Sequence, residues 1–248
     1  MTLEQAKSEA EVRAREREAT RLYEVTAEIA SSLDMDRTLD LIAAKAVELI
    51  GCDAAGILEY DPARDALTFV RDYNVDPDLR PIVVRPGEGI SGRAFQEGFP
   101  VWVRDISAGP PLTYSDRATQ DVVNKVAPRA ALAMPIVIQD GTYGVLVVYF
   151  SFPHTFTPTE IQLVAALAHQ ASIAIEKGRS LAEIEEGRRV FERLYRLAIA
   201  MQSSWDRDDR LRAFIDGAHE VVGFDRVYVL LMTDDGSAFE MVASYGEG

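Results

Sequence analysis

The sequence predicts an α/β (α+β) fold, in which strands that pair in hairpins are flanked by helices, with a long helix on either side of them in the chain. Three observations support this prediction: apolar runs that pair across turn residues, a helix start signal before a long unbroken stretch, and an internal repeat. With 248 residues, 48% of them hydrophobic, the chain can build a packed core.

Two helices are predicted before the first strand. Residues 3–33 contain no Gly or Pro and carry opposite charges four residues apart, which favours a helix. The apolar positions of its later part share one face and are expected to form a dimer seam with the same helix of a second chain: Leu22, Val25 and Ile29. A second helix is expected to begin after Asp34 or Asp36, either of which can cap it, and to end at Gly51.

The first half of the sheet begins with a predicted hairpin of residues 54–60 and 66–73, because a turn composition separates these two apolar runs. The elements expected after it are a weaker strand at 82–84, a short helix at 90–96, a strand at 100–103 and a loop with a short helix at 107–126. Two central strands, 130–138 and 143–152, should follow, because Asp140-Gly141 between two apolar runs is a strong hairpin signal.

A long helix is predicted from Thr157 to about Ser203. Thr157 and Glu160 form a capping box, Pro158 suits the first helical position, and no proline follows it. Apolar residues in a 4-3-4 pattern are expected to pack against the same helix of a second chain: Val164, Ala168, Ala171 and Ile175. The alternative for these first turns is that they cover only the sheet of their own domain.

An internal repeat is the most informative signal in the chain. At an offset of about 172 residues, roughly sixteen of some 54 positions from Arg21 to Asn74 recur identically, among them the Ser-Ser-x-Asp-x-Asp string at 31–36 and 203–208. Two copies of one module are the simplest account. The second copy reaches Gly248 without anything that matches 86–151, so the chain is expected to be cut from a longer protein.

The order and spacing of several short motifs resemble the GAF domain family. The motifs are Ser-Ser-Leu-Asp (31–34), Pro-Gly-Glu-Gly-Ile-Ser-Gly (86–92), Pro-Val with a later Asp (100–105), Ala-Met-Pro-Ile (133–136), Gly-Val-Leu (144–146), Phe-Thr (156–157) and the closing helix (167–176). The resemblance gives four regions: an N-terminal helical extension at 1–18, a GAF domain at 19–176, a connecting helix at 158–203 and a truncated second GAF domain at 191–248.

The resemblance implies a GAF/PAS-like central antiparallel sheet of about six strands, with helices on one face that pair between subunits and a small-molecule pocket on the other. Following the family layout, the residues that would line the pocket are Trp102, Asp105, Tyr114, Val122, Arg129, Ala131 and Met134. Arg129 could meet an anionic group, and the aromatic residues could stack on a planar one. The alternative is that Trp102 and Met134 are ordinary core residues and that Arg129 pairs with a local acid.

Known ligand chemistries of the family find little support in these residues. The only cysteine, Cys52, precedes the first strand, which argues against a covalent bilin, and a lone cysteine cannot perform methionine sulfoxide reduction. The Asn-Lys pair of cyclic-nucleotide phosphodiesterases is missing from the corresponding strand end, since Asn124-Lys125 lies in another element. Haem or iron is not expected from the positions of the three histidines, His154, His169 and His219. The cofactor therefore stays unknown.

The sequence is best interpreted as a regulatory sensor module of a larger signalling protein, such as a sensor histidine kinase or cyclase, that dimerises through parallel helices and controls an output domain. A ligand-free structural dimerisation spacer is the alternative. No catalytic constellation is found, so no enzyme activity is expected. A net charge of −14 argues against nucleic acid, no apolar run approaches the ~20 residues that cross a bilayer, and a single cysteine fits the cytoplasm.

Overall fold

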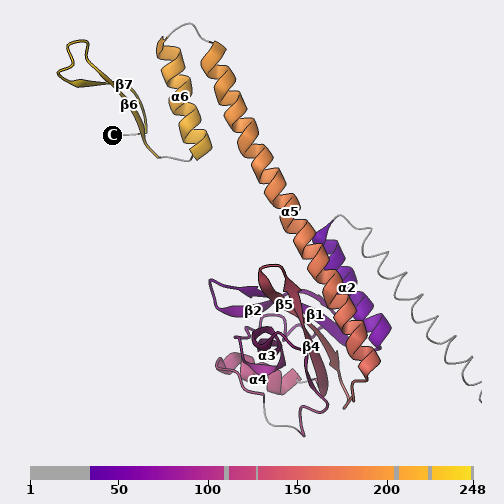
Figure 1. Cartoon of the computed structure of the whole chain (residues 1–248). Helices are drawn as coiled ribbons and strands as arrows, with labels where there is room; N and C mark the ends of the chain where they lie inside the picture. The colour runs from indigo at the N-terminus through magenta and orange to yellow at the C-terminus, as the bar shows by residue number, and fades with distance from the viewer. Residues whose placement is uncertain (1–33, 109–111, 127, 204–206, 223–224, 247–248) are drawn as a thin grey trace, which may run out of the picture. The chain divides into compact units, whose positions relative to one another are not determined.

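The computed structural model describes residues 34–108, 112–126, 128–203, 207–222 and 225–246. The chain divides into two compact units, Met1–Gly178 and Arg179–Gly248 (Figure 1). The predicted extension 1–18 and first helix, with the seam residues Leu22, Val25 and Ile29, lie outside the described residues.

The first unit contains a five-stranded antiparallel sheet in the order β2-β1-β5-β4-β3. Its strands are β1 (Ala54–Asp61), β2 (Ala66–Tyr73), β3 (Val101–Val103), β4 (Ala130–Ile138) and β5 (Gly141–Phe150). The expected strand at 82–84 contributes only one isolated bridge, between Val84 and Leu67. Pro81 and Pro86 flank this segment, and because proline has no N–H to donate, the pairing cannot extend. The sheet therefore has five strands rather than about six.

Helices cover both faces of this sheet, so it is buried on each side. On one face lie α2 (Met35–Ile50) and the first part of α5 (Pro158–Ser203), and on the other lie α3 (Gly89–Glu97) and α4 (Arg117–Val126) (Figure 1). Alternation along the strands divides the core accordingly, with Ile57 in the cluster under α2 and α5 and Leu58 in the cluster under α3.

The predicted helix boundaries are confirmed by their capping contacts. The Asp34 side chain accepts hydrogen bonds from the backbone N–H groups of two residues in the first turn of α2, and Gly51 ends that helix at φ 70°. At the start of α5, Glu160 Oε2 accepts from Thr157 N at 2.7 Å and Thr157 Oγ1 accepts from Glu160 N at 3.2 Å, which completes the capping box.

The four seam residues predicted on the early part of α5 lie inside the first unit. Val164, Ala168, Ala171 and Ile175 are 0%, 3%, 0% and 0% exposed and belong to the core cluster that also holds Leu132 of β4. The prediction that they meet a second chain is therefore wrong, because the sheet of their own domain already encloses them. The alternative stated for these first turns is the one that the structure supports.

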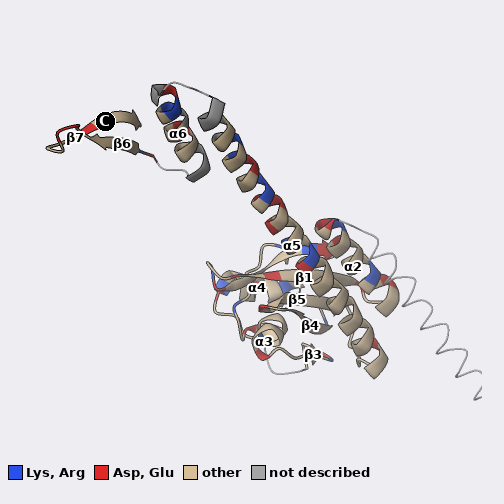
Figure 2. Cartoon of the chain, turned by 45° about the horizontal axis from the view of Figure 1, so that its top comes forward, with Lys and Arg blue, Asp and Glu red and all other residues tan. Residues whose placement is uncertain are grey.

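The later part of α5 has no such cover. Within the described side chains from Leu181 to Tyr195, every residue is exposed, and acidic and basic residues are both present along this stretch (Figure 2). Ion pairs within the helix include Arg188–Glu192 at 2.9 Å. No helix among the described residues is both long and apolar enough to cross a membrane.

The second unit repeats the start of the first. Adding 172 to the bounds of α2 gives those of α6 (Arg207–Val222), which is followed by the hairpin of β6 (Val227–Met232) and β7 (Phe239–Tyr245). The register of β6 with β7 reproduces that of β1 with β2, including the shift in register, which falls between Ile57 and Leu58 in one hairpin and between Val229 and Leu230 in the other. The repeat read from the sequence is thus a repeat of backbone pairing.

Candidate functional site

A small cavity lies inside the first unit, between the sheet and the segments that carry α3 and α4. Its volume is about 30 Å³, enough for one or two water molecules. The lining residues are Leu58, Leu79, Ile82, Val84, Ile90, Ser91, Ile106, Leu112, Tyr114, Val123, Pro128, Ala131 and Tyr149. Ligand sites usually measure about 300–1,000 Å³, so this cavity would have to open before it could take a metabolite.

The polar groups of the cavity are two phenols and a hydroxyl, from Tyr114, Tyr149 and Ser91. Burial, followed by the nearby negative charge of Glu88, raises the pKa of Tyr114 to about 12. Burial, followed by the proximity of Tyr114, also raises the pKa of Tyr149. Both phenols therefore stay neutral and can donate or accept a hydrogen bond, but neither supplies a charge.

Hydrogen bonds to Glu88, at the start of α3, hold together the two segments that cover the cavity. Glu88 accepts hydrogen bonds from Arg85 N at 3.0 Å and from Ser115 N at 2.8 Å, which joins the turn before α3 to the segment before α4. Burial alone would raise the pKa of Glu88, but these hydrogen bonds outweigh it and lower the pKa. Gly89 has φ 53°, and a Cβ there would collide with the Tyr114 ring, so the glycines of this motif serve close packing.

Asp105 and Arg129 form an ion pair at the end of β3. Arg129 donates from Nε to Oδ1 at 3.1 Å and from Nη2 to Oδ2 at 2.8 Å, and Ser107 also donates to Asp105 through its N–H and hydroxyl. The hydrogen bonds from Arg129, then those from Ser107, lower the pKa of Asp105. Both charges are therefore already satisfied within the domain, as the alternative for Arg129 stated.

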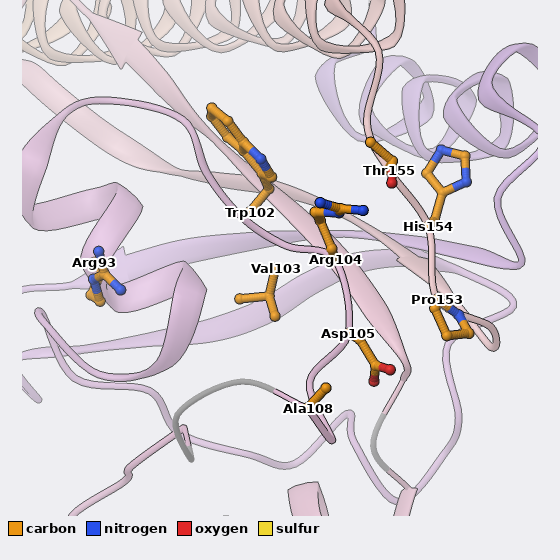
Figure 3. Close-up of a pocket in the computed structure, with 9 residues that line it drawn as sticks. All are labelled: Arg93, Trp102, Val103, Arg104, Asp105, Ala108, Pro153, His154 and Thr155. Carbon is orange, nitrogen blue, oxygen red and sulfur yellow. The ribbon is translucent and has the colours of Figure 1, made fainter.

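A second, wider cleft lies at the β3 edge of the sheet, outside the core. Its volume is about 720 Å³ (Figure 3). The lining residues come from α3, from β3 and the turn after it, and from the β5–α5 connection: Arg93, Trp102, Val103, Arg104, Asp105, Ala108, Pro153, His154 and Thr155. We call this the β3-edge cleft. Trp102 is 46% exposed there, so it is not the core residue that the alternative expected.

The structure separates the seven residues predicted to line one pocket. Tyr114 and Ala131 line the interior cavity, while Trp102 and Asp105 line the β3-edge cleft. Val122 and Arg129 line neither of these two; Val122 packs beside Val123, the α4 residue that does reach the cavity.

The placement of Met134 corrects the prediction. Its side chain is 4% exposed and packs in the cluster under α2 and α5, on the opposite face of the sheet from Ala131. These two residues are three apart on β4, and because side chains alternate along a strand they cannot share a face. Met134 is an ordinary core residue, as the alternative proposed.

Sequence reasoning missed Tyr149, one of the two tyrosines that line the cavity. Alternation along β5 places it on the same face as Val145 and Val147, so a strict two-residue period starting from either valine would have found it. The residues supplied by irregular segments, such as Leu79 and Pro128, had no comparable signal.

The remaining reactive side chains are engaged in packing. Cys52 is buried, its Sγ donates to the Ala46 carbonyl at 3.7 Å, and burial raises the pKa of its thiol to about 11. The His154 ring stacks on Phe150 at 4.0 Å and its Nε2 lies 2.9 Å from Glu160 Oε1. Within the described ranges, no group of three or more His, Cys, Asp or Glu side chains is arranged to hold a metal ion.

Comparisons with known proteins agree with this architecture. The model of the GAF domain family matches residues 32–176. A GAF domain from an Acinetobacter phosphoenolpyruvate-protein phosphotransferase is 18% identical with a TM-score of 0.56, over 66% of this chain and 95% of that one. A methyl-accepting chemotaxis protein segment is 24% identical with a TM-score of 0.52, over 63% and 98%.

One similar structure extends past the GAF match. The bacteriophytochrome RpBphP3 from the photosynthetic bacterium R. palustris is 14% identical, with a TM-score of 0.64 over 94% of this chain. The chain spans about half, 50%, of that structure's length. At these identities the likeness concerns the fold alone. No match was found among curated protein sequences.

Proposed function

Because the chain belongs to the GAF domain family, we propose that it is a regulatory sensor module of a larger signalling protein, of the sensor histidine kinase or cyclase type. It acts as a homodimer and passes a change of state in the first unit along α5 to an output domain. Likeness to sensory proteins such as the chemotaxis protein supports the regulatory role.

The observation that carries this proposal is an apolar stripe on the later part of α5. Leu181, Ile184, Phe191 and Tyr195 are 43%, 66%, 68% and 59% exposed, at successive spacings of three, seven and four residues. This is the spacing of coiled-coil positions that face a partner helix. The register places Arg188 at the one charged position between them, and Arg188 is paired to Glu192 within its own helix. We call these four residues the α5 stripe.

A parallel homodimer satisfies this stripe most simply. In such a dimer each stripe residue meets its own counterpart across a two-fold axis, so one apolar stripe is sufficient for both chains. The part of the proposed seam on α5 thus lies C-terminal to the four α5 residues that were first expected to form it. A change in the packing of the first unit would reach α5 at Gly178, the last residue of that unit, where an added Cβ would collide with the Met35 side chain of α2.

The second unit is proposed to be the front half of a second GAF domain. The support is its helix-hairpin order, its bounds at an offset of 172 and its shared register shift. The exposed outer face of its hairpin, which includes Leu230 and Phe239, is the face that the rest of the domain covers in the first unit.

A ligand-free dimerisation spacer is the second candidate function, since side chains leave an interior cavity of only about 30 Å³, too small for a metabolite. Catalysis by this chain is not proposed, because the buried, protonated Cys52 is a poor nucleophile. Its free thiol favours a reducing cytoplasm.

Light scattering on two matched variants tests the dimer. Ile184→Asp places a charge in the α5 stripe, and Ala182→Asp places the same charge about 200° around the same helix. We expect the wild type and Ala182→Asp to have the mass of a dimer and Ile184→Asp to dissociate at low micromolar concentration. A monomeric wild type, or equal masses for the two variants, would contradict the proposal.

A further inference from the structure

We propose that the β3-edge cleft binds a small aromatic anion, a planar ring that carries a carboxylate or a phosphate, with Trp102 as the stacking surface and Arg104 as the main charge contact. This site is separate from the interior cavity and from the α5 stripe, and it goes beyond the proposed regulatory role.

The side chains of the two principal residues project the same way, although Arg104 lies just past β3, which ends at Val103 (Figure 3). Val101 is buried and Val103 partly buried on the α3 side, so Trp102 and Arg104 project from the opposite side of the β3 segment (Figure 3). The cleft they line, at about 720 Å³, lies within the size range of small-molecule sites.

The exposure of Trp102 is unusual for its place in the sheet. Its partner on β4, Leu132, is fully buried on the same face, where α2 and α5 cover the sheet. At β3 the described helices no longer cover that face, and nearly half of the Trp102 side chain faces solvent. An indole with an uncovered face can stack on a planar ligand at little cost in conformational entropy.

Arg104 brings a positive charge that no residue in the described part of the domain neutralises. No carboxylate or hydrogen-bond acceptor among the described residues lies within bonding distance of its guanidinium. The neighbouring carboxylate of Asp105 is not available, because Arg129 and Ser107 occupy both of its oxygens. Arg104 is therefore free to pair with an incoming anion, and a planar guanidinium suits a carboxylate or a phosphate.

A second cation lines the cleft from the α3 side of β3, across the strand from Trp102 and Arg104. Arg93 of α3 contacts Glu97 only through Nε, at 3.4 Å, and this contact is exposed on both sides. Such surface pairs are weak, so Arg93 can turn to a ligand at small cost.

The charge of the whole chain favours a small ligand over an acidic macromolecule. With a net charge of −14, the protein repels large polyanions and acidic partners at long range. The binding of a small ion with one or two charges, by contrast, depends mainly on the nearest guanidinium groups, because salt screens charges beyond about 10 Å. We therefore assign the cleft to a small molecule.

Isothermal titration calorimetry with synthetic probes tests the site in the full chain. The probes are 2-naphthoate, 1-naphthyl phosphate and the neutral isostere 2-naphthamide. We expect both anions to bind at least about tenfold more tightly than the amide, since a charged hydrogen bond is worth that much. The tighter of the two anions identifies the carboxylate or the phosphate as the preferred group.

Variants assign the effect to named residues. Arg104→Gln should reduce naphthoate binding to the level of the amide, and Trp102→Ala should weaken all three probes. Two controls elsewhere on the first unit should leave binding unchanged: Arg117→Gln, an exposed arginine, and Tyr73→Ala, an aromatic residue exposed to a similar extent at 44%. Circular dichroism melting curves confirm that each variant folds.

Equal binding of naphthoate and naphthamide, or a preference that survives Arg104→Gln, would overturn the assignment. So would binding of an acidic aromatic pentapeptide with no binding of any naphthyl probe, which would identify a peptide site instead. The mass of the protein by light scattering is independent of these results, so failure here leaves the dimer proposal intact.

Discussion

The segment α2–β1–β2 of the first unit and the segment α6–β6–β7 of the second share one backbone plan but differ in burial. Leu58 and Leu230 occupy the same position after the register shift, yet Leu58 is 0% exposed and Leu230 is 52% exposed. Leu67 and Phe239 form an equivalent pair, at 0% and 69%. The helices differ less uniformly, since Ala43 of α2 and Ile215 of α6 are both buried, whereas Ile42 is 0% exposed and its equivalent Phe214 is 41% exposed.

This difference separates what a local sequence encodes from what the whole domain provides. The helix, the hairpin and its register recur in both units, so the local residues are sufficient to specify them. Burial of the outer face recurs only where β5 and α3 are present to supply it. The energetic value of one apolar residue is therefore set by elements distant in the chain.

The largest expected effect comes from truncating the two equivalent leucines. Leu58→Ala should destabilise the first unit by about 2–5 kcal/mol, because it leaves a cavity in a packed core, whereas Leu230→Ala should cost less than about 0.5 kcal/mol. Urea unfolding with hydrogen exchange of peptides from β1 and β6 measures each loss separately. Similar losses at the two positions would break the comparison and indicate that Leu230 is covered in solution.

A smaller, pH-dependent effect is expected in the turn between β6 and β7. Hydrogen bonds from the Thr233 hydroxyl and from Ser237 lower the pKa of Asp235 to about 2. A lowered folded-state pKa means that this stabilisation is complete above the ordinary aspartate value of about 4 and is lost as the pH falls toward 2.

Two variants test whether the lowered pKa of Asp235 stabilises the hairpin. Asp235→Asn should accelerate amide exchange in β6 and β7 at neutral pH and remove their additional loss of protection in acid. Asp61→Asn, at the last residue of β1 before the equivalent turn of the first unit, serves as the control and should leave β6 and β7 unchanged. An Asp235→Asn protein with unaltered exchange would show that the turn contributes nothing to the hairpin.

Most of the fold could be predicted from the sequence because its signals are local. The capping box at Thr157 and Glu160 placed the start of α5, and the Asp-Gly turn placed the central hairpin within two residues. The internal repeat relates α6 to α2 residue by residue. The prediction of a sixth strand at 82–84 was wrong because Pro81 and Pro86 outweigh the β propensity of the residues between them.

The candidate site was less predictable because pockets depend on which face a residue occupies and on which distant segments cover it. Met134 was placed on the wrong face although the two-residue period of β4 contains the answer. The prediction of a dimer seam on the first turns of α5 was wrong for another reason. Val164 and Ile175 have the spacing of a coiled coil whether they face a sheet or a partner helix. Only the burial by their own sheet distinguishes these possibilities.

Disulfide cross-linking along α5 tests the central claim, that signal passes through a parallel pairing of the α5 stripe. In a Cys52→Ser background, cysteines at Ile184 and Phe191 should each form intermolecular disulfides rapidly under mild oxidation, because a two-fold axis brings identical residues together. A cysteine at Ala182, on the opposite side of the helix, should react slowly. Cross-linking that is absent at all three positions, or as fast at 182 as at 184, would contradict the account.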